Sequence, residues 1–132
     1  MSEFTEVERE AIAVQFVRVE DTQPEITRAW NELEAVVALR GRHFYGAFDA
    51  TADDYRACVE VRDGDPIAPD LESGTLPGGR YLRARLRGNA PGIYQQIKPT
   101  FDALVAQHAP DDTRPSLEHY RRHDEIDLLL PI

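Results

Sequence analysis

The feature that most constrains this chain is an order of predicted elements that occurs twice. Residues 10–20 are rich in β-branched and apolar side chains, which predicts a largely buried strand. Pro24 suits the first turn of a helix whose apolar residues recur every three or four positions, and Gly41 is expected to end that helix. Residues 43–61 then form two runs with apolar side chains at every second position, which predicts a hairpin.

The second half follows the same order. Residues 80–88 alternate between apolar and polar side chains, as expected for a strand. Pro91 opens a second predicted helix, and Pro99 within it is expected to kink it or to separate its first turn. Residues 114–132 predict a second hairpin. Few residues match between the halves, so the duplication is inferred from the order of elements.

Two βαββ units of this kind predict an α+β fold with pseudo-twofold symmetry. We expect antiparallel sheets with both helices on one face and a ligand groove on the other. The chain is expected to form one domain over 1–132, with 1–9 flexible. Its halves are predicted at about 10–62 and 79–132, and the Gly- and Pro-rich segment 63–78 is predicted to be a connecting loop.

Composition limits the class of protein. With 132 residues, 42% of them hydrophobic and 30% charged, the chain can bury one core without disulfides, and the lone Cys58 forms none within the chain. No signal-like or membrane-length apolar run is present, so the cytoplasm is the expected location. The net charge of −9 argues against nucleic-acid binding. It favours cationic partners or simply solubility.

Glu118 stands out because it interrupts the apolar pattern of the last hairpin. Strand alternation places it on one face with Ser116 and Tyr120. We assign the alternate residues of the partner strand, such as Leu128, to the helix side, so that Glu118 is expected to face the groove with Tyr120 and Asp127 nearby. A buried carboxylate needs a proton, a donor or a cationic ligand.

Less specific explanations remain for this carboxylate. If Glu118 does not meet a ligand, two explanations are left. Its side chain is exposed to water, or it forms an ion pair with Arg83 or Arg85. His119 and His123 lie beside several acidic residues, but a turn among them is expected to direct the side chains outward, so no metal site is predicted. No cofactor is expected either.

Several short stretches together resemble the GyrI-like small-molecule-binding family, which also forms the effector-binding half of multidrug-responsive transcription regulators. The likeness extends from about residue 13 to 132. The stretches are FYGAFD (44–49), DYRACV (54–59), GRYL (79–82), PGIY (91–94), PSLEHY (115–120) and LPI (130–132). Those regulators carry a helix-turn-helix domain before the sensor, and the chain has no room for one, so a stand-alone form is expected.

The resemblance implies a central groove in which Glu118 meets lipophilic cations between aromatic side chains, with Tyr120 close by. One subgroup, the cyclopropanoid cyclopropyl hydrolases, uses the groove carboxylate in catalysis. We therefore expect binding of a hydrophobic, cationic small molecule, for sequestration or sensing. The expected ligand-binding residues are Glu118, Tyr120, Trp30, Tyr45, Tyr55, Tyr81, Tyr94 and Phe101.

Two other functions are compatible with the sequence. A hydrolase acting on electrophilic small molecules would use Glu118 as general base or acid and Tyr120 as a donor to the leaving oxygen. Alternatively, the acidic surface would engage a basic protein partner, such as a DNA-handling enzyme. No direct contact with nucleic acid or membrane is expected.

Overall fold

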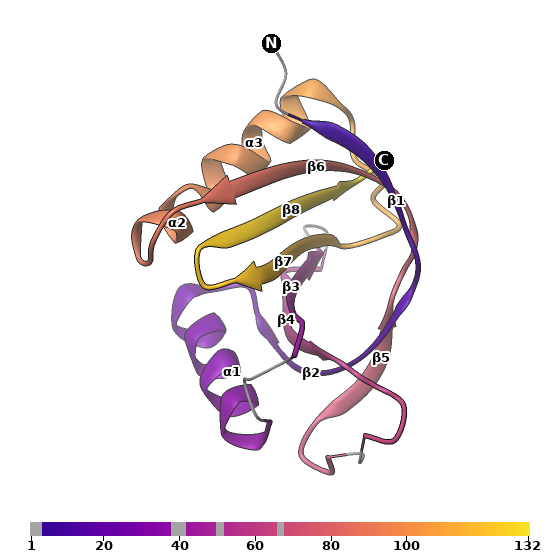
Figure 1. The fold of residues 1–132 in the computed structure, drawn as a ribbon, viewed down its shortest axis with the longest axis vertical. Coiled ribbons are helices and arrows are strands. Elements are labelled where there is room, and N and C mark those ends of the chain that lie inside the picture. Colours follow the sequence, from indigo (N-terminus) through magenta and orange to yellow (C-terminus); the bar gives the residue numbers. More distant parts are fainter. Residues whose placement is uncertain (1–3, 38–41, 50–51, 66–67) are drawn as a thin grey trace.

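The computed structural model describes residues 4–37, 42–49, 52–65 and 68–132, and within them the chain has an α+β fold (Figure 1). Eight antiparallel strands form one sheet that curls into a half-barrel, with helices α1 (Gln23–Val36) and α3 (Ile97–Gln107) and the short α2 (Gly92–Gln95). The strands are β1 (Thr5–Arg9), β2 (Ile12–Glu20), β3 (Phe44–Asp49), β4 (Asp54–Glu60), β5 (Glu72–Leu76), β6 (Gly79–Arg87), β7 (Ser116–Arg122) and β8 (Glu125–Pro131).

The strand order places the two halves of the chain side by side. The order is β1-β6-β8-β7-β3-β4-β2-β5, so that the two predicted hairpins, β3–β4 and β7–β8, meet where β3 pairs with β7. Each edge strand pairs with the more distant half of the chain. β1, which precedes the first half, pairs with β6 of the second half, and β5, which directly precedes the second half, pairs with β2 of the first half. The elements follow the predicted order, while an internal duplication stays a prediction.

Two predicted irregular segments contain strands. Residues 1–9 were expected to be flexible, yet 5–9 form β1; residues 1–3 lie outside the described part. The predicted loop 63–78 contains β5. Both strands are held by side chains in the curled core, since Val7 packs against it and Leu76 is fully buried within it.

The helices begin as predicted, but α1 is shorter than expected. Pro24 lies in the first turn of α1, and the N–H of Val37 closes the last turn by donating to the Leu33 carbonyl at 3.1 Å. The expected end at Gly41 lies outside the described residues. A first turn is separated from the second helix as predicted, because α2 ends before Gln96 and Pro99 falls in the first turn of α3.

The sheet has two buried faces. The concave face holds a core drawn from nearly all strands: Val14, Phe16, Tyr45, Ala47, Cys58, Leu76, Tyr81, Leu117 and Leu129. The helices lie outside the curl (Figure 1), where α1 covers one cluster around Leu33 and α3 another around Leu104. No helix in the described ranges is long and apolar enough to cross a membrane.

Candidate functional site

Strand register places Glu118 on the helix-covered face, between the two helices. On β7, Glu118 pairs with Gly46 of β3 on one side and with Leu128 of β8 on the other. Gly46 in turn pairs with Ala57 of β4. Leu128 packs in the cluster of α3 and Ala57 in the cluster of α1, so Glu118 lies over the seam between the halves.

The expected face was therefore wrong. Leu128 does lie on the helix side, but it pairs directly with Glu118, which puts both on the same face. Asp127 pairs with His119 and so faces the concave side, where Arg85 holds it through bonds of 2.7 and 3.1 Å. A shift of one residue in the pairing moves every side chain of a strand to the opposite face of the sheet. The alternation within one strand does not determine this pairing register.

Glu118 is 7% exposed and accepts hydrogen bonds from two tyrosines. The hydroxyl of Tyr120 donates to Oε1 at 2.6 Å, and that of Tyr55 donates to the same oxygen at 3.0 Å. The indole N–H of Trp30 donates to the Tyr55 oxygen at 3.1 Å, which extends the chain of donors to α1. Within the described residues, Oε2 accepts no hydrogen bond and no Arg, Lys or His pairs with this carboxylate.

This environment disfavours the charged carboxylate. Burial raises the pKa of Glu118 above its usual value of 4.5, the hydrogen bonds from Tyr120 and Tyr55 lower it, and the nearby carboxylate of Asp21 raises it. Burial also raises the pKa of both tyrosines well above 10, so that they remain protonated donors at neutral pH. The carboxylate thus has hydrogen bonds but no counter-charge from any residue that the structure describes.

Gly46 makes room for this arrangement, and the sequence analysis did not identify it. A Cβ on Gly46 would lie 2.3 Å from the Tyr55 oxygen and 2.4 Å from Glu118 Oε1. Because glycine inside a strand often marks such a close approach, the signal was present in the motif FYGAFD.

Aromatic rings surround the two tyrosines on the helix face. Trp30 packs edge-on against Tyr120, with ring centroids 5.3 Å apart, and against Phe44 at 6.2 Å. Phe48 of β3 meets Phe101 of α3 edge-on at 5.0 Å, in the cluster that also contacts Tyr120. Phe44 and Phe48 were not among the predicted ligand-binding residues.

A cavity of about 180 Å³ adjoins these rings. Phe48, Phe101 and Leu130 give it apolar walls, and Asp49, Asp102 and Asp111 are among the acidic residues that line it. Ser116 also lines it and lies on the same face of β7 as Glu118, which itself does not line the cavity. A second hollow, beside the start of α1, is bordered by Glu20, Asp21 and Asp53.

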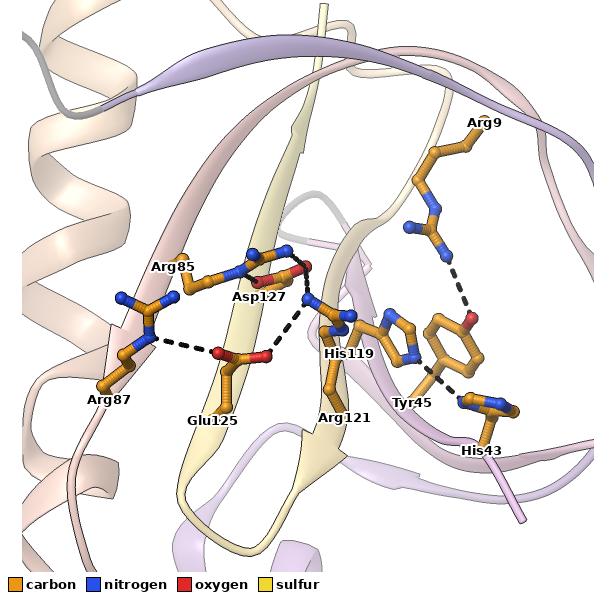
Figure 2. Close-up of polar contacts among 9 residues, drawn as sticks. All are labelled: Arg9, His43, Tyr45, Arg85, Arg87, His119, Arg121, Glu125 and Asp127. Carbon is orange, nitrogen blue, oxygen red and sulfur yellow. Dashed lines mark hydrogen bonds and ion pairs between the residues drawn. The ribbon is translucent and has the colours of Figure 1, made fainter. Parts of the chain in front are cut away.

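The remaining predicted residues lie elsewhere. Of the eight, Glu118, Tyr120, Tyr55 and Trp30 meet directly and Phe101 lies nearby on the same face. Tyr45 and Tyr81 belong to the concave core, and Figure 2 shows Tyr45 beside His119 and Arg9 there. Tyr94 is 51% exposed on α2. Neither Arg83 nor Arg85 reaches Glu118, because both share the concave face with Tyr81.

Comparison with known proteins supports the fold and identifies a family. The model of the GyrI-like small molecule binding domain matches residues 3–132. An integron cassette protein from the mobile metagenome of Vibrio cholerae is 14% identical and superposes with a TM-score of 0.80, over 98% of this chain and 95% of that one. The protein SAV2435, solved bound to tetraphenylphosphonium, is 16% identical with a TM-score of 0.70, over 98% and 93%.

One curated relative is similar over a shorter stretch. It is described as Chaperone protein DnaJ 1 of Streptomyces albus G and is 38% identical over 61 residues, which cover 45% of this chain and 73% of that protein. The match leaves more than half of this chain outside it.

Proposed function

This chain belongs to the GyrI-like small molecule binding domain family, and on that premise we propose that it binds a lipophilic organic cation on the helix face, between α1 and α3. One observation carries the proposal: Glu118 is 7% exposed, and no cationic group among the described residues pairs with it. On this proposal the ligand supplies the positive charge that pairs with the Glu118 carboxylate.

Electrostatics favours a cation at this position. Burying an unpaired carboxylate costs several kcal/mol, so a positive ligand recovers part of that cost. Asp21 is close enough to Glu118 to raise its pKa, and the pKa of Asp21 is itself raised by burial and by Asp53 and Asp54. This concentration of negative charge would attract a cation and repel an anion.

The aromatic rings suit the apolar part of such a ligand. Trp30, Tyr55 and Tyr120 present rings around the carboxylate, and a cation over a desolvated ring gains about 2 kcal/mol. Tetraphenylphosphonium, the ligand in the SAV2435 structure, has this combination of one positive charge and several flat rings. It is therefore the first probe for this chain.

We expect the site around Glu118 to be closed when no ligand is bound. Trp30 packs edge-on against Tyr120 and donates to the Tyr55 hydroxyl, so we expect a ligand that reaches Glu118 to displace the indole. The cavity beside Phe48 and Phe101 offers apolar space for groups that do not contact the carboxylate. Binding would thus change the surroundings of Trp30, the single tryptophan of the chain.

Tryptophan fluorescence tests the proposal directly. Titration with tetraphenylphosphonium should change the emission of Trp30, and Glu118→Gln should weaken binding about tenfold or more, because the counter-charge is lost while the shape remains. Glu34→Gln, an exposed position on the same helix as Trp30, is the matched control and should bind normally. Equal affinity in wild type and Glu118→Gln would refute the role of the carboxylate.

Hydrolysis by the same residue is the second hypothesis. A general base must reach water or substrate within hydrogen-bond distance, and since both tyrosines donate to Oε1, the other carboxylate oxygen would have to serve as the base. A hydrolase would consume an electrophilic ligand, and mass analysis of the ligand after incubation distinguishes this from binding. A protein partner for the acidic surface also stays a prediction.

A further inference from the structure

His119 is buried on the concave face with an unpaired nitrogen. It is 7% exposed, and its Nδ1 is the only buried side-chain N or O atom without a hydrogen-bond partner among the described residues. Its Nε2 lies 3.4 Å from Nδ1 of His43, at the limit of a hydrogen bond. A buried polar atom without a partner costs about 1–3 kcal/mol, so a group that would bind it is worth seeking.

Arg9 lies at the hydroxyl end of Tyr45, the neighbour of His119, and has no carboxylate partner in the described part of the chain. Its guanidinium donates to the Tyr45 hydroxyl at 3.0 Å and lies 5.8 Å from the centre of that ring. The imidazole of His119 stacks on the Tyr45 ring at 4.3 Å, nearly parallel. Arg9 and His119 therefore both contact Tyr45, one at its hydroxyl and one on its ring, and each has unused hydrogen-bonding capacity (Figure 2).

A neighbouring ion-pair network adds further positive charge. Three arginines share the carboxylates of Asp127 and Glu125 (Figure 2). Arg85 binds Asp127 at 2.7 Å, and Arg87 binds Glu125 at 3.1 Å. Arg121 contacts both carboxylates, at 3.1 Å from Glu125 and 3.9 Å from Asp127. Three guanidinium groups against two carboxylates leave an excess of one positive charge, before Arg9 is counted.

The lowered pKa of His119 is consistent with a positive electrostatic potential around its ring. Burial and, to a smaller extent, the neighbouring Arg9, His43 and Arg121 together lower the pKa of His119 to about 4, while Asp127 acts in the opposite direction. Glu60 is a further acidic group near the Tyr45 ring, because it raises the pKa of Tyr45. In a protein of net charge −9, this part of the concave face is thus locally positive.

A metal ion fits these residues poorly. Two imidazole nitrogens 3.4 Å apart have suitable spacing for two ligands of one ion, but no group of three His, Cys, Asp or Glu side chains converges in the described ranges. The adjacent guanidinium of Arg9 would also repel a cation.

We propose that the concave face beside Tyr45 binds the oxyanion group, a carboxylate or phosphate, of a small anionic molecule. Arg9 supplies a charged donor at the hydroxyl end of Tyr45, and neutral His119 supplies an Nδ1–H donor beside the ring, with Nε2 free to accept from His43. This site is separate from that of Glu118, because adjacent residues of β7 point to opposite faces of the sheet. Arg121 adds long-range attraction from the rim.

The proposal is tested with phosphate, pyrophosphate and citrate as probes, and with imidazole nitrogen NMR of His119 as the readout. A bound oxyanion stabilises the charged imidazole, so the pKa of His119 should rise from about 4 when a probe binds. Arg9→Gln should weaken binding about tenfold or more, because a charge-assisted hydrogen bond is lost. Stronger binding of pyrophosphate than of citrate indicates a phosphate ligand, and the reverse order a carboxylate.

The matched control is Arg80→Gln. Arg80 is exposed on β6 beside Tyr81, so its side chain points to the opposite face while the charge change is identical. Equal weakening by Arg80→Gln and Arg9→Gln would mean diffuse attraction rather than a site, and would overturn the proposal. So would a His119 resonance that does not respond to any of the three probes in a protein shown to be folded by circular dichroism.

Discussion

Replacing Gly46 with alanine tests the packing that positions the buried carboxylate. The new Cβ would lie 2.3 Å from the Tyr55 oxygen, 2.4 Å from Glu118 Oε1 and 3.0 Å from Tyr55 Cζ, whereas ordinary contacts begin at 3.4 Å. Two atoms must therefore move by about 1 Å. Glu118 has several rotatable bonds and can move, but Tyr55 is only 3% exposed, so its ring has little space into which to move.

The expected cost follows from these overlaps. Overpacking a buried site costs about 1–3 kcal/mol. Moving the Tyr55 hydroxyl by about 1 Å breaks its 3.0 Å bond to Glu118, and a hydrogen bond to a charged group contributes about 1.5–3 kcal/mol. Because the carboxylate keeps Tyr120, we expect a total loss of about 2–4 kcal/mol in the free energy of unfolding, measured by urea denaturation.

A double-mutant cycle makes the reasoning specific. Tyr55→Phe removes the oxygen that lies 2.3 Å from the new Cβ, so Gly46→Ala should cost at least about 1 kcal/mol less in the Tyr55→Phe background than in wild type. Gly92→Ala is the control, since no atom lies within 4 Å of its Cβ position and helix propensity favours alanine. Strictly additive costs, or a Gly46→Ala protein as stable as Gly92→Ala, would refute the steric argument.

Three further predictions concern pH, each measured by urea unfolding at several pH values. Burial raises the folded-state pKa of Glu118 above 4.5, so charging it costs stability as pH rises; Glu118→Gln should be more stable than wild type at pH 7 and should lose this advantage below pH 4.5. Burial lowers the folded-state pKa of His119 to about 4, so wild type should lose stability as pH falls from 6.5 towards 4, and His119→Phe should not show this loss. Hydrogen bonds from Thr113 and Arg114 lower the pKa of Asp111 to about 2, so Asp111→Asn should be less stable than wild type at pH 7, and the difference should shrink below pH 3.8 and vanish below pH 2.

Local patterns predicted the elements that carry strong signals of their own. The hairpins β3–β4 and β7–β8 and the helix starts at Pro24 and Pro91 follow from alternation, helical spacing and proline chemistry, which act within a few residues. The edge strands β1 and β5 were missed because each has only one neighbour and exposes three of its five residues, so TEVER and ESGTL look like polar loops. Their pairing depends on residues far away in the chain.

The same limit explains what was right and wrong about the site. Glu118 was identified because a carboxylate in an apolar strand requires a partner, which is a local argument. Its face depends on pairing with Leu128 and Gly46, and these pairs are set by the turn and the seam between the halves. Tyr45 and Tyr55 could not be assigned to opposite faces for the same reason.

The alternation of β7 gives the two proposed sites opposite electrostatic character across one sheet. Glu118 faces the helices near the carboxylate of Asp21, while His119 faces the concave side near Arg9 and Arg121. Since backbone and apolar side chains separate the two groups, each charge acts mainly on its own face. Glu118→Gln should therefore weaken tetraphenylphosphonium binding and leave pyrophosphate binding unchanged, whereas Arg9→Gln should do the reverse. If either substitution weakened both ligands equally, the two faces would not be independent, and a shared change in the sheet would have to replace the two-site account.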